Sequence, residues 1–266
     1  RLMSSEALAV QGPMARNTGD CALLLSAMAG PDARVPIALT EPGARFRTPL
    51  ARDLNGLRLA WSPTLGQFEV DHEVLAVLER ALPAFGALGC VLDSASPDLT
   101  DADEVFRVLR AWQFAARFGP DFERMRPQLK DTVVWNIEQG LALSLDDVTQ
   151  AEIKRSQIIA RMAAFFERYD FLLCPTTQVP PFPIEQEWVK NINGRDLPTY
   201  LDWMGVCYAI TVTGCPAISV PAGFTASGLP VGLQVIGRRW ADLDVLQLAC
   251  GFESATRHGE RRPMVV

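Results

Sequence analysis

The sequence predicts an α/β fold in which a mixed β-sheet is flanked by α-helices. Two apolar runs, at residues 217–220 and 231–236, are rich in β-branched side chains and bounded by Gly or Pro, as buried strands are. Turn-forming residues at 225–228 separate the runs, so we expect them to pair as a hairpin. A strand–helix–strand pattern over residues 57–92 indicates that parallel pairing also occurs in the sheet.

The beginning of the chain predicts one helix followed by a long loop. Asn17 offers N-cap chemistry, apolar side chains then recur with helical spacing, and Gly30 ends the pattern. Residues 32–55 are rich in Pro, Arg and Gly and show little periodicity. We therefore expect a surface loop there, which is the best candidate for a linker in a chain whose 266 residues otherwise predict a single domain.

The strand–helix–strand unit follows this loop. Residues 57–61 are expected to form a strand, and Asp71 then caps an amphipathic helix. Pro83 lies inside that helical pattern and is expected to kink it, because proline lacks the backbone N–H that an internal helical position donates. Gly89 ends the helix before a second strand at 90–92.

The rest of the chain predicts further helices, one short strand and one long loop. Apolar spacing predicts helices over residues 100–118, 144–168, 202–212 and 241–256. Residues 171–174 are expected to form a strand, and residues 179–198 a long loop of the kind that often lines binding sites. Pro221 is expected to mark the end of the strand at 217–220, because proline cannot donate to a ladder.

Composition argues against several classes of function. The net charge is −6 and the basic residues are scattered, which argues against a nucleic-acid partner. No apolar run approaches the ~20 residues of a membrane span. Two His residues and the lack of any Cys-x-x-Cys pair argue against a zinc site, and no metal or cofactor is expected. The six Cys are dispersed in mostly apolar contexts, so we expect reduced thiols and a cytoplasmic location.

Familiar catalytic machinery is missing from the sequence. There is no Gly-x-Ser-x-Gly elbow and no Gly-rich phosphate-binding loop. His72 and His258 are expected to be solvated surface residues, and Cys174 a buried structural thiol. Asp101 and Asp103 are two positions apart on a predicted helix, so they do not face each other.

Three segments together resemble the amidase signature family. Residues 214–224 read GCPAISVPAGF and residues 228–234 read GLPVGLQ, which is similar to the C-terminal hallmark of that family. Residues 11–17, reading QGPMARN, resemble the segment that follows the catalytic core of the family, and residues 169–177, reading YDFLLCPTT, provide a third match. The matches keep the order of the family and cover nearly the whole chain.

The resemblance implies hydrolysis of carboxamide C–N bonds by a Ser nucleophile, which a second Ser and a Lys base activate. In the family these residues precede the segment matched here by residues 12–16. The Gly-Gly-Ser-Ser-Gly stretch that carries the serines is absent, and the Ser4–Ser5 pair lacks flanking glycines. The three lysines, Lys130, Lys154 and Lys190, lie in polar contexts. No catalytic residue is therefore assigned, and we expect the chain to be the C-terminal portion of a single amidase domain. It begins with Arg1, so we expect that sequence upstream is absent or was removed.

The resemblance also implies that this part of the enzyme supplies walls of the substrate pocket. The candidate substrate-binding residues are Thr176, Trp188, Trp203, Met204 and Thr211. Many relatives carry Asn at the position of Thr211, which puts a polar substrate contact there in doubt. The tRNA-dependent branch of the family usually has an acidic residue near Met204, so the Met here favours a more apolar amide substrate.

Three functional hypotheses remain open from the sequence alone. The first is the C-terminal portion of a cytoplasmic amidase, inactive alone, acting with the rest of the enzyme on a small-molecule amide. The second is a catalytically inactive, amidase-like remnant that serves as a binding or interaction module. The third is an independent enzyme that uses Cys174 or a carboxylate pair. No nucleic-acid or membrane partner is expected, and the formation of a homo-oligomer is left open.

Overall fold

The computed structural model describes residue 3 and residues 8–261. Its centre is a five-stranded mixed sheet with the strand order β2-β1-β3-β7-β6. The strands are β1 (Arg58–Trp61), β2 (Val91–Ser94), β3 (Phe171–Pro175), β6 (Ala217–Phe224) and β7 (Pro230–Gly237). β1 pairs in parallel with both β2 and β3, whereas β7 runs antiparallel to both β3 and β6. The predicted mixed sheet, its parallel unit and its hairpin are confirmed.

The hairpin extends further than the apolar runs alone indicate. β6 continues through Pro221 to Phe224, and a register shift marks a bulge between Pro221 and Gly223. The expectation that Pro221 ends this strand is therefore wrong. The physical reason is that β6 is an edge strand, where one side of the backbone has no ladder partner and a missing N–H costs little.

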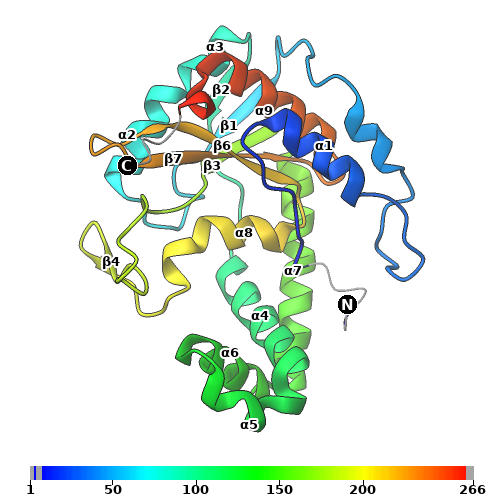
Figure 1. Cartoon of the computed structure of the whole chain (residues 1–266), viewed down its shortest axis with the longest axis vertical. Coiled ribbons are helices and arrows are strands. Elements are labelled where there is room, and N and C mark those ends of the chain that lie inside the picture. Colours follow the sequence, from blue (N-terminus) through cyan, green and yellow to red (C-terminus); the bar gives the residue numbers. More distant parts are fainter. Residues whose placement is uncertain (1–2, 4–7, 262–266) are drawn as a thin grey trace.

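Helices cover both faces of the sheet (Figure 1). On one face lie α2 (His72–Ala81), α3 (Pro83–Ala87) and α9 (Asp242–Thr256), with α1 (Thr18–Met28) packed outside α9. On the other face lie α4 (Ala102–Phe118), α7 (Leu145–Phe165) and α8 (Gly205–Thr213). The break between α2 and α3 falls directly before Pro83, as expected from its missing N–H.

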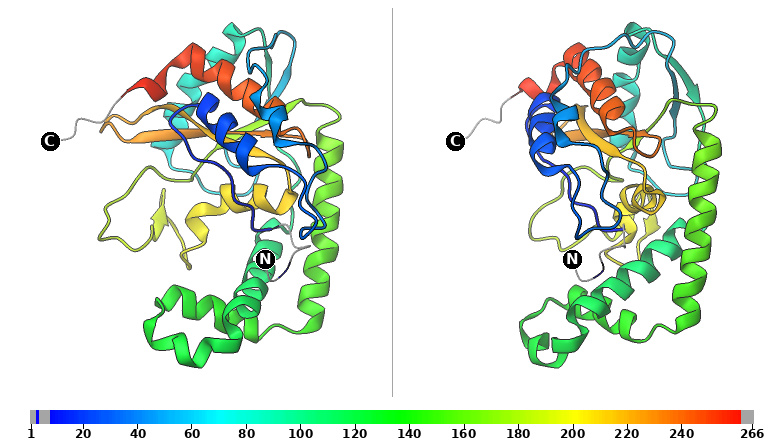
Figure 2. Two further views of the ribbon diagram at one scale, coloured as in Figure 1. Left: turned by 45° about the vertical axis from the view of Figure 1, so that its right-hand side comes forward. Right: turned by 90° about the vertical axis from the view of Figure 1, so that its right-hand side faces the viewer.

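A helical lobe projects away from the sheet (Figure 2). It consists of the far ends of α4 and α7 together with α5 (Phe122–Met125) and α6 (Asp131–Leu141). The long helix α7 joins the lobe to the sheet, and it begins with a capping box in which Ser144 and Asp147 exchange hydrogen bonds. Two short 3-10 turns, Gly119–Asp121 and Arg126–Gln128, complete the lobe.

The long predicted loop after β3 contains a small hairpin of its own. β4 (Asn191–Ile192) pairs antiparallel with β5 (Arg195–Asp196), and a 3-10 turn at Asp202–Met204 precedes α8. Other 3-10 turns lie at Gly43–Arg47 and His258–Glu260. Phe46, from the first of these turns, is buried with Cys21 of α1 and Leu246 of α9, so the predicted loop at 32–55 packs against the main body.

The main apolar core lies between the sheet and both helical layers. Its largest fully buried side chains include Phe85, Leu172 and Phe252, and the rings of Phe85 and Phe252 stack with their centroids 4.7 Å apart. Within the described residues no helix is both long enough and apolar enough to cross a membrane. In the same part of the chain no three His, Cys, Asp or Glu side chains are grouped so that they could hold a metal ion.

Candidate functional site

Two of the predicted substrate-binding residues lie at the carboxyl end of β3. Thr176 directly follows the strand, and its backbone N–H donates to the carbonyl oxygen of Gly232 on β7 at 3.0 Å. Thr211 lies on α8, one turn after Cys207, and its hydroxyl donates to the Cys207 carbonyl oxygen at 3.3 Å. The Cys207 thiol in turn donates to the carbonyl oxygen of Thr176 at 2.7 Å. Cys207 therefore connects the two predicted residues.

A hydroxyl pair spans the middle strand of the hairpin sheet at this point. The Oγ1 atom of Thr176 lies 2.8 Å from the Oγ atom of Ser219 on β6, although β7 runs between their strands. Gly232 of β7 makes this contact feasible, because a Cβ atom there would lie 2.7 Å from Ser219 Oγ and 2.9 Å from Thr176 Oγ1. Ser219 is exposed and Thr176 is half-buried, so the pair forms a polar spot that a ligand can reach.

The other three predicted residues belong to the long loop and the turn before α8. The Trp203 ring packs edge-on against Phe182, with centroids 5.4 Å apart, over a small cluster formed by the buried side chains of Val179, Ile192 and Leu197. Met204 is half-buried and packs against the main core. The Trp188 indole N–H is buried without a hydrogen-bond partner among the described residues, while the Lys190 ammonium lies 5.2 Å from the ring centroid. The five predicted residues thus form two groups rather than one continuous wall.

Gln178 holds the two groups in place. Its side-chain amide donates to the carbonyl oxygens of Glu69 and Asp202, both at 2.9 Å, and its amide oxygen accepts the backbone N–H of Gly205 at 2.5 Å. The side chain is only 1% exposed, so these bonds are not exchanged for bonds to water. They fix the start of α8, and hence Cys207 and Thr211, relative to the end of β3.

The two thiols near the site are not activated nucleophiles. Burial raises the pKa of Cys207 to about 11, and burial raises the pKa of Cys174 still further. The Cys174 thiol is fully buried and accepts a hydrogen bond from the Gln234 side chain at 3.3 Å. Both groups therefore carry a proton at neutral pH, whereas a thiol attacks only as the thiolate. This arrangement gives no support to an independent enzyme based on Cys174.

The lysines and histidines likewise form no catalytic arrangement. Lys154 donates to Glu104 at 2.6 Å, and this hydrogen bond raises the pKa of the ammonium group. A Lys base must be neutral, so Lys154 is unsuited to that role. His72 is exposed at the first position of α2, as predicted, whereas His258 is half-buried against the edge of Phe224. The Ser4–Ser5 pair lies outside the described residues.

Sequence reasoning identifies Thr176 and Thr211 but misses Ser219, Cys207 and Gly232. The alternation of side chains along β6 could have placed Ser219 on an exposed face, but its meeting with Thr176 depends on strand register. Cys207 lies four positions before Thr211 on the predicted helix, and this spacing is the signal that could have joined them.

Comparisons with known proteins agree with the fold. The chain is 35% identical over 260 residues to an acylamidase of Rhodococcus erythropolis, covering 96% of this chain and 54% of that protein. It is 29% identical over 277 residues to one of the subunits of the glutamyl-tRNA(Gln) amidotransferase of Moorella thermoacetica, covering 95% and 55%. The chain thus spans about half the length of the curated relatives it matches.

Solved structures give the same result. A bacterial aryl acylamidase of the amidase signature family superimposes with a TM-score of 0.85 at 25% identity, over 95% of this chain and 55% of that one. The fold of a 6-aminohexanoate cyclic dimer hydrolase matches with a TM-score of 0.78 at 20% identity, over 94% and 55%. The sequence model of the Amidase family matches residues 3–246. Because this match includes the sheet, both helical layers and the candidate site, the chain belongs to the amidase family.

Proposed function

We propose that this chain is the C-terminal part of an amidase that hydrolyses a carboxamide C–N bond to a carboxylate and ammonia or an amine. In this proposal the chain supplies sheet strands and walls of the substrate pocket. The nucleophilic Ser, the second Ser and the Lys base come from a segment upstream. Membership of the amidase family supports this proposal, as does the coverage of only 54–55% of the first relatives.

The observation that carries the proposal is the open edge of the sheet at β6. Ala217, Ser219 and Pro221 of this strand are exposed, and no further strand pairs with it among the described residues. The neighbouring helix α1 exposes Leu23 by 59% and Met28 by 50%. A long open edge beside exposed apolar side chains is uncommon in a finished monomeric domain. An upstream segment that covered this surface would also approach the Thr176–Ser219 hydroxyl pair.

For the substrate, we propose an acyl amide with an apolar acyl group. Met204 stands where the resemblance leads us to expect an acidic residue in the tRNA-dependent branch. Identity to the acylamidase, at 35%, exceeds the 29% identity to the amidotransferase protein. The half-buried rings of Trp188 and Trp203 offer apolar surface on the same side of the molecule.

The test compares the 266-residue chain with the same chain joined to its upstream coding sequence, using hydrolysis of an acyl anilide as the assay. The chain alone should give the rate of the buffer, and the longer protein should be active. Replacing the Gly-flanked upstream Ser with Ala should lower kcat by a factor on the order of 10³ or more. Ser156→Ala is the matched control, because Ser156 is exposed on α7 and bonds only to its own helix at Glu152.

Hydrolysis by the chain alone would contradict the proposal. So would an upstream sequence without a Gly-flanked Ser pair and a Lys. The second of these results, obtained with a soluble and cooperatively folded chain, would instead support the inactive binding module.

A further inference from the structure

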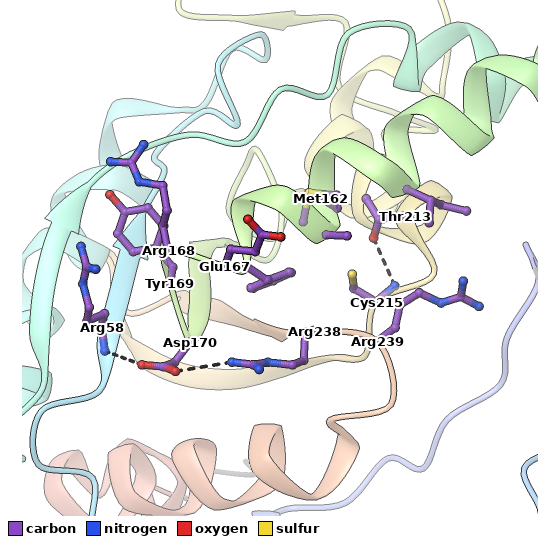
Figure 3. A pocket seen from close by; sticks show the side chains of 13 residues that line it. Arg58, Met162, Glu167, Arg168, Tyr169, Asp170, Thr213, Cys215, Arg238 and Arg239 are labelled. Carbon is purple, nitrogen blue, oxygen red and sulfur yellow. Dashed lines mark hydrogen bonds and ion pairs between the residues drawn. The ribbon is translucent and has the colours of Figure 1, made fainter.

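A cavity of about 600 Å³ lies at the opposite end of the sheet from Thr176 (Figure 3). It is bordered by the start of β1 at Arg58, by the connection between α7 and β3, and by Arg238 and Arg239 after β7. The length of β3, five residues or about 17 Å, separates it from Thr176. Its volume is in the range of small-molecule sites. This cavity is therefore distinct from the candidate amide site, and none of the five predicted substrate-binding residues lines it.

One wall of the cavity is apolar and is formed by α7. Ile159, Met162, Ala163 and Phe166 line it. Their spacing of three and four residues places them along one face of the end of the helix. Met162 and Phe166 are anchored in the core, at 1% and 6% exposure, whereas Ala163 is exposed on the rim. The cavity thus offers a short apolar strip that leads to its polar side.

The polar side of the cavity is rich in arginine. Four arginines line it, against the two carboxylates of Glu167 and Asp170. This gives a local excess of two positive charges in a chain whose net charge is −6. In Figure 3, Asp170 lies between Arg58 and Arg238: it accepts the backbone N–H of Arg58 at 2.8 Å and is 3.5 Å from the Arg238 guanidinium.

Arg239 is available for a ligand. Among the described residues no carboxylate lies within ion-pair distance of its guanidinium, which packs 4.8 Å from the centroid of the Trp240 ring. Arg239 lies beside Cys215, and its positive charge lowers the pKa of that thiol against the larger opposing effect of burial. Glu167 points toward the cavity from the α7 side in Figure 3. An anionic group is therefore expected next to Arg238 and Arg239, away from Glu167.

We propose that this cavity binds a small amphipathic carboxylate, with its carboxylate group at Arg238 and Arg239 and its alkyl tail along the α7 wall. A guanidinium fork matches the geometry of a carboxylate, and the apolar wall has the length of a short chain. A doubly charged phosphate would meet stronger repulsion from Glu167 and Asp170 and would leave the wall unused. The inference does not depend on the proposed amidase activity, because it concerns the other end of the sheet.

The experiment titrates the 266-residue chain with hexanoate by calorimetry at low ionic strength. Hexanamide serves as the neutral probe of the same shape, and inorganic phosphate as the bare anion. We expect saturable hexanoate binding with a Kd on the order of 1 mM, as suits so small a ligand. Hexanamide and phosphate should each bind at least tenfold more weakly.

Two pairs of variants locate the site. Arg239→Gln should weaken hexanoate binding on the order of tenfold, because a charge-assisted hydrogen bond is lost. Arg117→Gln is its control, since Arg117 is also exposed and packs on the next residue, Phe118, outside the cavity. Ala163→Phe should block the tail, whereas Ala164→Phe alters the neighbouring exposed position of α7, which does not line the cavity.

Equal affinity for hexanoate and hexanamide would overturn the proposal, as would phosphate binding as tight as that of hexanoate. Equal affinities within each variant pair would do the same. Circular dichroism of each variant verifies that it is folded, and the two independent pairs keep the test decisive if one variant fails to fold.

Discussion

At the scale of single residues, Gly232 determines the geometry of the candidate site. Its missing side chain lets the hydroxyls of Thr176 and Ser219 meet across β7 at 2.8 Å. The main chain of Gly232 also accepts the N–H of Thr176, so one residue fixes both the backbone and the side chain at the end of β3. The contact belongs to strand packing and at the same time shapes the surface a substrate would reach.

Gly232→Ala is predicted to destabilise the chain by about 1–3 kcal/mol, because overpacking forces neighbouring groups to move. The new Cβ would lie 2.7 Å from Ser219 Oγ and 2.9 Å from Thr176 Oγ1. Urea unfolding measures the loss. Adding Ser219→Ala should restore part of it, since the nearer of the two oxygens is removed.

Gly86→Ala is the matched control for this prediction. Gly86 lies within α3, and an added Cβ there meets nothing within 4 Å. This control should be neutral or stabilise by up to about 1 kcal/mol, since alanine favours helix. Equal losses from Gly232→Ala and Gly86→Ala would show that the hydroxyl pair does not limit the space at Gly232.

The residue scale also shows why sequence reasoning finds only part of the site. Thr176 stands out by its place after an apolar strand in a family-like segment. Its partner Ser219 lies 43 positions away, and their contact requires that β7 be inserted between β3 and β6. Side-chain alternation tells which face a residue occupies, but not which strand lies next to it. Pairing over such distances is set by packing of the whole sheet.

At the scale of elements, an arginine on α4 ties the helical layer to the turn before α8. Arg107 Nε donates to Asp103 at 2.8 Å, and its Nη atoms reach Thr199 Oγ1 at 3.0 Å and Asp202 at 2.5 Å. The Tyr208 hydroxyl of α8 donates to the same Asp103. The network therefore fixes α8, and with it Cys207 and Thr211, from the side facing away from the sheet.

Arg107→Ala is predicted to destabilise the chain by about 1–3 kcal/mol, because partly buried carboxylates lose their charged partner. The Arg107 side chain is 25% exposed and that of Asp202 is 20% exposed, so water compensates only in part. Arg107→Lys should recover little, since an ammonium cannot reproduce a fork that reaches three partners. Thermal unfolding measures both changes.

The control is Arg124→Ala, whose partner Asp121 is three residues away on the surface. The Arg124 side chain is 74% exposed, so its removal should alter the unfolding free energy by less than about 0.5 kcal/mol. A loss for Arg107→Ala no larger than this would mean that the network does not hold α8.

The elements themselves are largely predictable from the sequence, for physical reasons that differ among them. The start of α7 at Ser144, the break at Pro83 and the β6–β7 hairpin each depend on local chemistry, namely a cap, a missing N–H and a turn. The sequence predicts the first turn of a helix where the structure has a 3-10 turn at Asp202–Met204, because apolar spacing alone does not separate the two. The placement of β3 between β1 and β7 depends on partners far apart in sequence.

At the scale of the whole molecule, the two ends of the sheet offer different surfaces. One end carries the hydroxyl pair and the long loop, and the other carries the arginine-rich cavity. The β6 edge runs between them and is flanked by α1, whose Leu23, Leu24 and Met28 are exposed. If an upstream segment covers β6 in the complete enzyme, the isolated chain presents that surface to other copies of itself.

We therefore predict that the isolated chain self-associates through the surface formed by α1 and β6. Light scattering coupled to gel filtration should show dimers or larger species at concentrations of tens of micromolar, because open edges and apolar patches invite pairing. Leu23→Glu combined with Met28→Glu should shift the chain to monomer. Thermal stability should change little, since the two side chains are 59% and 50% exposed. Leu145→Glu is the matched control, as Leu145 is 85% exposed but lies in the distant helical lobe. A chain that is monomeric throughout, or that responds equally to Leu145→Glu, would show that the β6 edge is already a finished surface. That result would favour the binding module over the amidase portion.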